Sequence, residues 1–169
     1  IVSETPGTTR DAIDTVFECE DEPILFIDTA GIRRRGKIEV GIERYSVMRA
    51  LNAISRADVV LLVAEAGEVM NAQDMHIAGY IQEALKGIVV VVNKWDLAGK
   101  LGVEKARCTR EIRQKLKFLP DVPIVFASAQ FGKGIDKVLS AAQEVYEERQ
   151  KRLSTPLLND EMNRAIVAH

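Results

Sequence analysis

Short apolar runs alternate with amphipathic stretches along most of the chain. Residues 13–20 alternate between apolar and polar positions, as a half-exposed strand does, and residues 23–28 form a short buried run. Two further runs, 58–64 and 87–92, are almost continuously aliphatic, as strands covered on both faces require. The last predicted strand covers residues 123–127.

The stretches between these runs show helical spacing. Apolar residues recur at helical intervals within 39–56 and from 134 onward, and helices are also predicted over 72–86 and 103–117. Regular alternation of strands and helices predicts an α/β fold with a parallel sheet and helices on both faces. Ligands in such folds bind at the carboxyl ends of the strands, so the residues after each strand are the candidates for chemistry.

The pattern changes near residue 153. Thr155 is predicted to cap a helix with Pro156 at its first position, and residues 153–169 are enough for one helix only. This segment is either an appendage or the beginning of a second domain.

Composition excludes several classes of protein. The chain has 169 residues, of which 47% are hydrophobic, 28% charged and 5% aromatic. No apolar run approaches the roughly 20 residues of a membrane span, and two cysteines cannot form a disulfide framework. A globular protein of a reducing, intracellular compartment fits best.

The net charge of −2 conceals strong segregation. Residues 1–30 carry eight acids and one base, whereas residues 31–56 carry seven bases and two acids. Residues 100–117 repeat the basic balance, again with seven bases and two acids. The two basic zones fit either a polyanion-binding face or solvated surfaces.

Two predicted strands end in polar motifs, of which DTAG comes first. The carboxylate of Asp28 suits Mg²⁺ held through water, and Gly31 lets a backbone N–H approach a terminal phosphate. Taken alone, this tetrapeptide fits a simple turn equally well.

The second motif, NKWD, follows residues 87–92. The carboxylate of Asp96 can accept hydrogen bonds from N1–H and the 2-amino group of guanine, both of which adenine lacks. Asn93 is expected to tie neighbouring loops together and to approach N7 of the base, and the stem of Lys94 to pack over the ring. A polar turn capped by Asp96 is the simpler alternative, but the motif directly follows four valines, which favours a guanine site.

A small-residue turn, Ser128-Ala129, follows the last predicted strand and can offer a backbone N–H to guanine O6. The order DTAG, NKWD, SA resembles the G domain of P-loop GTPases. Residues 5–11 (TPGTTRD) are similar to the first switch loop of the Era/EngA/TrmE-like GTPases. The resemblance implies that Thr8 and Thr9 lie beside the nucleotide, and that Thr9, favoured over Thr8, binds Mg²⁺ together with Asp28.

A narrower resemblance rests on DTAGIRRRGK and the following ERYS, which are similar to the second G domain of the bacterial EngA/Der double GTPases. It implies GTP and GDP as ligands, Mg²⁺ and in some members K⁺, and conversion of GTP to GDP and phosphate. It further implies a cytoplasmic protein that binds ribosomal RNA of the pre-ribosomal large subunit. Residues 1–152 would then be the G domain, and 153–169 the first helix of a KH-like domain.

Two departures from the GTPase pattern stand out. The sequence contains no GxxxxGK[ST] loop, so we expect a complete guanine subsite beside a half-built phosphate and Mg²⁺ subsite. The missing strand, loop and helix would precede the sequence, be disordered or come from another chain. We therefore expect this chain to bind GDP no tighter than about millimolar. Ile32 replaces the water-orienting Gln of many GTPases, so no catalytic base is assigned.

Four bases in five residues, Arg33, Arg34, Arg35 and Lys37, follow Gly31. They fit contact with RNA phosphates as well as a solvated loop. The basic helix 103–117 is interpreted as a solvated face.

The sequence thus predicts a P-loop GTPase-like α/β domain with three layers, truncated at its N-terminus. Two alternatives remain open. One is a non-hydrolysing module that docks on RNA or protein, and the other is a different Era-like GTPase with another partner.

Overall fold

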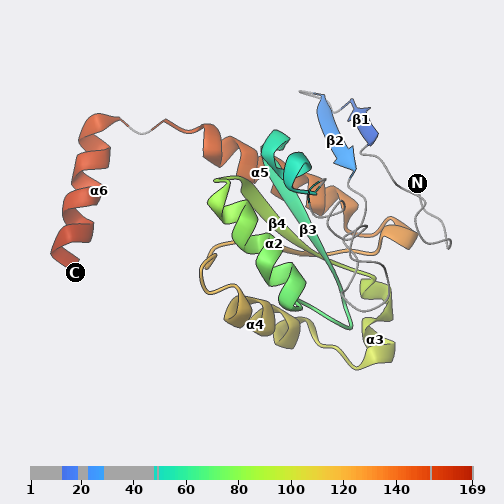
Figure 1. The fold of residues 1–169 in the computed structure, drawn as a ribbon. Helices are drawn as coiled ribbons and strands as arrows, with labels where there is room; N and C mark the ends of the chain where they lie inside the picture. Colours follow the sequence, from blue (N-terminus) through green and yellow to red (C-terminus); the bar gives the residue numbers. More distant parts are fainter. Residues whose placement is uncertain (1–12, 19–22, 29–47, 49, 153, 169) are drawn as a thin grey trace.

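The centre of the molecule is a three-stranded parallel sheet in the order β3-β4-β5 (Figure 1). The strands are β3 (Val59–Glu65), β4 (Gly87–Asn93) and β5 (Ile124–Phe126). The computed structural model describes residues 13–18, 23–28, 48, 50–152 and 154–168. Within these, all three strands of the parallel sheet lie within three residues of the ranges predicted from the apolar runs.

Strand β4 divides the hydrophobic core into two halves, because its side chains alternate between the two faces of the sheet. Ile88, Val90 and Val92 belong to the larger half, which helices α2 (Ala72–Glu83) and α4 (Lys105–Lys115) cover. Val89 and Val91 belong to the smaller half, which helix α5 (Ile135–Gln150) covers. The result is the predicted three-layer arrangement with helices on both faces (Figure 1).

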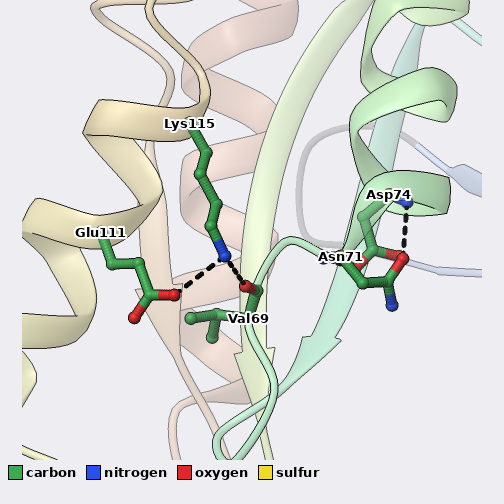
Figure 2. Close-up of polar contacts among 5 residues, drawn as sticks. All are labelled: Val69, Asn71, Asp74, Glu111 and Lys115. Atoms are coloured by element: carbon green, nitrogen blue, oxygen red, sulfur yellow. Dashed lines mark hydrogen bonds and ion pairs between the residues drawn. The ribbon is translucent and has the colours of Figure 1, made fainter.

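Helix α2 has well-defined ends. The side chain of its N-cap, Asn71, accepts a hydrogen bond from the N–H of Asp74 (Figure 2). It also accepts from the N–H of Gln73, and the Asp74 carboxylate accepts from the Asn71 N–H. This capping box satisfies donors that the first turn would leave unpaired. At the other end Leu85 has a φ of 53°, so the helix stops at Glu83, before the predicted end at residue 86.

Shorter elements connect these helices and strands. The 3₁₀ turn η1 (Trp95–Leu97) and helix α3 (Ala98–Leu101) follow β4, and the 3₁₀ turn η2 (Ala129–Phe131) follows β5. Helix α4 begins two residues later and ends two residues earlier than the predicted 103–117.

Helix α6 (Thr155–Ala168) lies apart from the sheet and its helices (Figure 1). The Leu158 N–H donates to the Ser154 carbonyl, so Ser154 is the N-cap rather than the predicted Thr155. Its side chains are exposed from Thr155 to Val167, including Leu157 and Ile166. None of the described helices is long and apolar enough to span a membrane.

The first two strands differ from the prediction. β1 (Ile13–Phe17) and β2 (Ile24–Asp28) form an antiparallel hairpin, and β2 is not the buried strand that its apolar sequence suggested, because Leu25 is half exposed. Within the described residues the hairpin pairs only with itself, so neither strand is covered on both edges. An ion pair of 2.5 Å between Asp14 and Arg56 joins the hairpin to the end of helical residues 50–56.

Strand β3 also departs from the expectation of full burial on both faces. Val63 is 55% exposed, although its neighbour Leu62 is buried. β3 is an edge strand among the described strands, whereas β4 has a partner on each side. An uninterrupted aliphatic run therefore does not by itself distinguish a central strand from an edge strand.

The same Val-to-Ala substitution separates these two environments. Val90→Ala removes fully buried methyl groups, so we expect the free energy of unfolding to fall by about 2–3 kcal/mol. Val63→Ala should cost less than about 1 kcal/mol, because that side chain already contacts water. Urea denaturation followed by circular dichroism measures both. Equal losses would contradict the assignment of β4 as the buried centre.

Candidate nucleotide-binding site

Two loops meet at the carboxyl ends of β4 and β5. Asn93 is the last residue of β4, and its side-chain Oδ1 accepts a 3.0 Å hydrogen bond from the backbone N–H of Ala129. The Trp95 N–H donates to the Ala127 carbonyl at 3.0 Å. These two bonds join the loops, as the sequence predicts for Asn93.

Asp96 lies in the same cluster. The Ser128 hydroxyl donates to Asp96 Oδ1 at 2.5 Å, and Ser128 is 3% exposed. A buried hydroxyl bonded to one carboxylate oxygen fixes the orientation of the carboxylate plane. Asp96 itself is exposed, so its other oxygen can face a ligand. The structure thus brings together Asn93, Asp96, Ser128 and Ala129, as the motif order suggested.

Lys94 differs from its neighbours in backbone conformation. Its φ of 58° and ψ of 32° are left-handed, which costs a non-glycine residue about 1 kcal/mol or more. Its ammonium group forms a 2.7 Å ion pair with Glu65 Oε1. Glu65 is the last residue of β3 and pairs in register with Asn93 of β4. The sequence analysis missed Glu65, although the rule of looking at strand ends would have found it.

Trp95 points away from this polar cluster and into packing. Its ring meets that of Phe126 edge-on, with centroids 4.4 Å apart, and it contacts the larger half of the core. The ammonium group of Lys105, the first residue of α4, lies 5.0 Å from the centre of the Phe126 ring. Trp95 therefore packs its loop against the core and does not cover the exposed Asp96.

The loop after β5 closes tightly. Ser128 and Lys133 exchange two backbone hydrogen bonds of 2.9 and 3.1 Å, and glycines with positive φ stand at 132 and 134. At Gly134 an added Cβ would lie 2.6 Å from the Phe126 carbonyl oxygen. Only glycine fits this position without moving the strand.

The turn Ser128-Ala129 is expected from the sequence to offer a backbone N–H to guanine O6. In the structure the Ala129 N–H donates to Asn93 Oδ1. A ligand carbonyl at this point would compete with the Asn93 side chain for the same donor. The competition is between two neutral hydrogen bonds of similar strength.

The phosphate side of the candidate site is described only in part. Asp28 is the exposed last residue of β2, where it pairs in register with the first residue of β1, and its carboxylate makes no hydrogen bond or ion pair with the described residues. Thr8, Thr9, Gly31 and the basic residues 33–37 lie outside the described residues. No cluster of three or more potential metal ligands occurs in the described part of the chain.

Cys108 carries no chemistry of its own. Burial, followed by the nearby charge of Glu111, raises the pKa of its thiol. The thiol therefore stays protonated near neutral pH and packs as an apolar side chain in the core.

Comparison with known proteins agrees with this geometry. The family described as 50S ribosome-binding GTPase matches residues 1–94. The chain belongs to this family. It is 49% identical over 167 residues to GTPase Der of Chloroflexus aggregans and 50% identical over 167 residues to that of Caldanaerobacter subterraneus. These matches cover 99% of the chain but only 37% and 38% of those proteins, so the chain spans little more than a third of their length.

Solved structures of Era show the same fold. Era in complex with MgGDPNP and nucleotides of 16S ribosomal RNA matches with a TM-score of 0.69 and 31% identity. Era of Aquifex aeolicus bound to GDP and AlF₄⁻ matches with a TM-score of 0.68 and 32% identity. Each match covers 83% of the chain and 46% of the Era chain. The predicted fold class and the predicted family are both confirmed.

The closure of the loop after β5 can be tested with two glycines. Gly134→Ala forces a methyl group against the Phe126 carbonyl and places alanine at a φ of 78°, so the free energy of unfolding should fall by about 2 kcal/mol or more. Gly79→Ala in α2 meets nothing within 4 Å and should raise it by about 0.5–1 kcal/mol. Chemical denaturation measures both, and a neutral Gly134→Ala would contradict the described loop.

Proposed function

We propose that this chain binds guanine nucleotides and is the switch domain of a GTPase that converts GTP to GDP and phosphate during assembly of the large ribosomal subunit. The observation that carries the proposal is the Asp96 carboxylate, oriented by Ser128 beside the Asn93–Ala129 link. The family and the similarity to GTPase Der support it.

Guanine recognition follows from the hydrogen-bonding capacity of these groups. Asp96 accepts from N1–H and the 2-amino group of the base while the Ser128 hydroxyl holds one of its oxygens. An adenine at the same place would leave the carboxylate without donors, which costs the full desolvation of a charged group. Glu65 holds the Lys94 ammonium so that its methylene stem can cover the ring.

The phosphate side depends on residues that sequence similarity alone assigns. We propose that Thr9, or its neighbour Thr8, and Asp28 hold Mg²⁺, and that Gly31 offers its N–H to the terminal phosphate. Hydroxyl and carboxylate oxygens are the hard ligands that this ion prefers, and bound Mg²⁺ supplies neutralisation of phosphate charge. Ile32 cannot orient water, so water would be positioned by backbone groups, other side chains or a K⁺ ion.

The remaining assignments concern partners. We propose that the protein is cytoplasmic and that ribosomal RNA of the large subunit is its macromolecular partner, with Arg33, Arg34, Arg35 and Lys37 in contact with phosphates. Residues 1–152 would form the G domain, and 153–169 would begin a KH-like domain. The exposed apolar side chains of α6 are consistent with a helix that packs against further chain.

Calorimetric titration with Mg²⁺ present tests the base preference of this chain. We expect GDP to bind saturably, with an affinity no tighter than about millimolar, and ADP to give no saturable signal at the same concentrations. Equal binding of both nucleotides would contradict a guanine site. Failure of both would favour a docking module without nucleotide chemistry.

Asp96→Asn gives a sharper test, because the base xanthine carries a carbonyl where guanine has its 2-amino group. The Asn amide can accept from N1–H and donate to that carbonyl, so the preference for GDP over xanthosine diphosphate should invert, by about 100-fold or more. Fluorescence of Trp95, the single tryptophan, reports binding. The control Asp121→Asn, in an exposed loop, should keep the GDP preference.

A further inference from the structure

The region around α4 is the most basic part of the described structure. Residues 100–117 carry seven bases and two acids, a charge of +5, whereas the whole chain has a net charge of −2. The rest of the chain therefore carries −7. The helix lies at the periphery, on the face of the sheet opposite α5 (Figure 1).

Three of the seven bases have structural partners. Figure 2 shows the clearest case: the Lys115 ammonium bridges Glu111 Oε1 at 2.8 Å and the Val69 carbonyl at 3.0 Å, which ties α4 to the loop before α2. Lys105 lies over an aromatic ring of β5, and Arg113 donates to a backbone carbonyl of the loop that follows the helix at 2.6 Å. These three side chains anchor α4 to the domain.

Three others form an outward surface, which we call the basic face: Arg107, Arg110 and Lys117. All three side chains are exposed, and none of these side chains makes a hydrogen bond or an ion pair with the described residues. Buried Cys108 and Ile112 occupy the opposite side of the helix. Arg107 and Arg110 lie about one helical turn apart on α4, and Lys117 follows two residues after the end of the helix.

Arg107 and Arg110 make no ion pair within the described structure. Yet Glu104 and Glu111 lie three and four residues from Arg107. Arg107 stands in the first turn of α4, where the helix dipole disfavours a cation, and Arg110 is its like-charged neighbour three residues on. Glu111, the one acid within α4, is already bound by Lys115. A partner that supplies negative charge would remove this repulsion.

The chemistry of the surface selects among polyanions. Around the two arginines of the basic face the exposed neighbours on α4, Ala106 and Gln114, offer neither an aromatic ring for stacking on single-stranded bases nor a large apolar side chain for insertion into a lipid surface. Among the described residues, the exposed aromatic ring beside the basic face is Phe118, which follows Lys117 at its far end and is 37% exposed. Two of the three cations are arginines, which bind phosphate with two parallel hydrogen bonds. We propose that the basic face binds the phosphate backbone of double-stranded RNA, an inference that rests on the RNA partner proposed above.

The test compares two variants of the full chain, each lacking two arginines and one lysine. Arg107→Gln, Arg110→Gln and Lys117→Gln together remove the basic face. Binding to a labelled RNA duplex of about 20 base pairs is followed by fluorescence anisotropy at increasing salt. We expect affinity to fall about 10-fold or more, and the slope of log Kd against log salt to fall by about 3.

The matched control removes the same charge from exposed positions in and just after α5: Lys137→Gln, Arg149→Gln and Arg152→Gln. It should change the slope by less than about 1. Equal losses in both variants, or no loss in the first, would overturn the proposal. So would binding that depends on the basic face to phosphatidylserine vesicles or polyglutamate but not to RNA.

GDP titration of both variants by Trp95 fluorescence keeps this inference separate from the proposed function. Unchanged GDP binding together with loss of RNA binding supports the basic face. GDP binding without RNA binding in the unaltered chain refutes the basic face alone, and the reverse result refutes the nucleotide site alone. Urea denaturation confirms that each variant remains folded.

Discussion

The candidate site depends on the burial of one strand. β4 is covered on both faces, so every residue from Gly87 to Val92 is buried, and its backbone pairs in a defined register with β3 on one edge and with β5 on the other. Its last residue, Asn93, therefore leaves the sheet at a fixed point between the ends of β3 and β5. The polar loops are assembled around that point, which is why a short stretch of valines precedes the most informative side chains of the molecule.

Few hydrogen bonds and ion pairs hold these loops, and each loop contains one energetically unfavourable feature. Lys94 adopts a left-handed backbone that its side chain disfavours, and Ser128 buries a hydroxyl that must find an acceptor. The Asp96 carboxylate satisfies Ser128, and Glu65 holds the Lys94 side chain. The polar groups thus satisfy one another while one carboxylate oxygen of Asp96 stays available. Such mutual satisfaction places recognition groups accurately on loops that contribute little apolar burial.

Sequence patterns predicted the parallel sheet, its helices and the meeting of Asn93, Asp96, Ser128 and Ala129, because strand ends in such a sheet gather at one edge. The sequence patterns failed to predict how exposed a strand residue is, because its exposure depends on which elements pack beside the strand. The aliphatic composition of β2 and β3 resembles that of β4, yet Leu25 and Val63 are exposed because each strand is covered less completely. A sequence does not rank competing acceptors: the turn Ser128-Ala129 is expected to offer a backbone N–H to a ligand, and the Ala129 N–H donates to Asn93 Oδ1 in the structure. The end of α2 depended on the positive φ of Leu85, a residue whose type gives no such signal.

The cations of helix α4 fall into two groups, those that contact the rest of the domain and those that face outward. Its inward cations have partners that join the helix to the loop before α2, to β5 and to the chain that follows it, so these positions are explained by the fold. Its outward cations have no such explanation, since the side chains of Arg107 and Arg110 make no ion pair or hydrogen bond with the described residues. The interpretation of residues 103–117 as a solvated face treated all of these charges alike. Once the structure separates anchored from free side chains, Arg107, Arg110 and Lys117 remain as the surface on which the proposed contact with RNA rests.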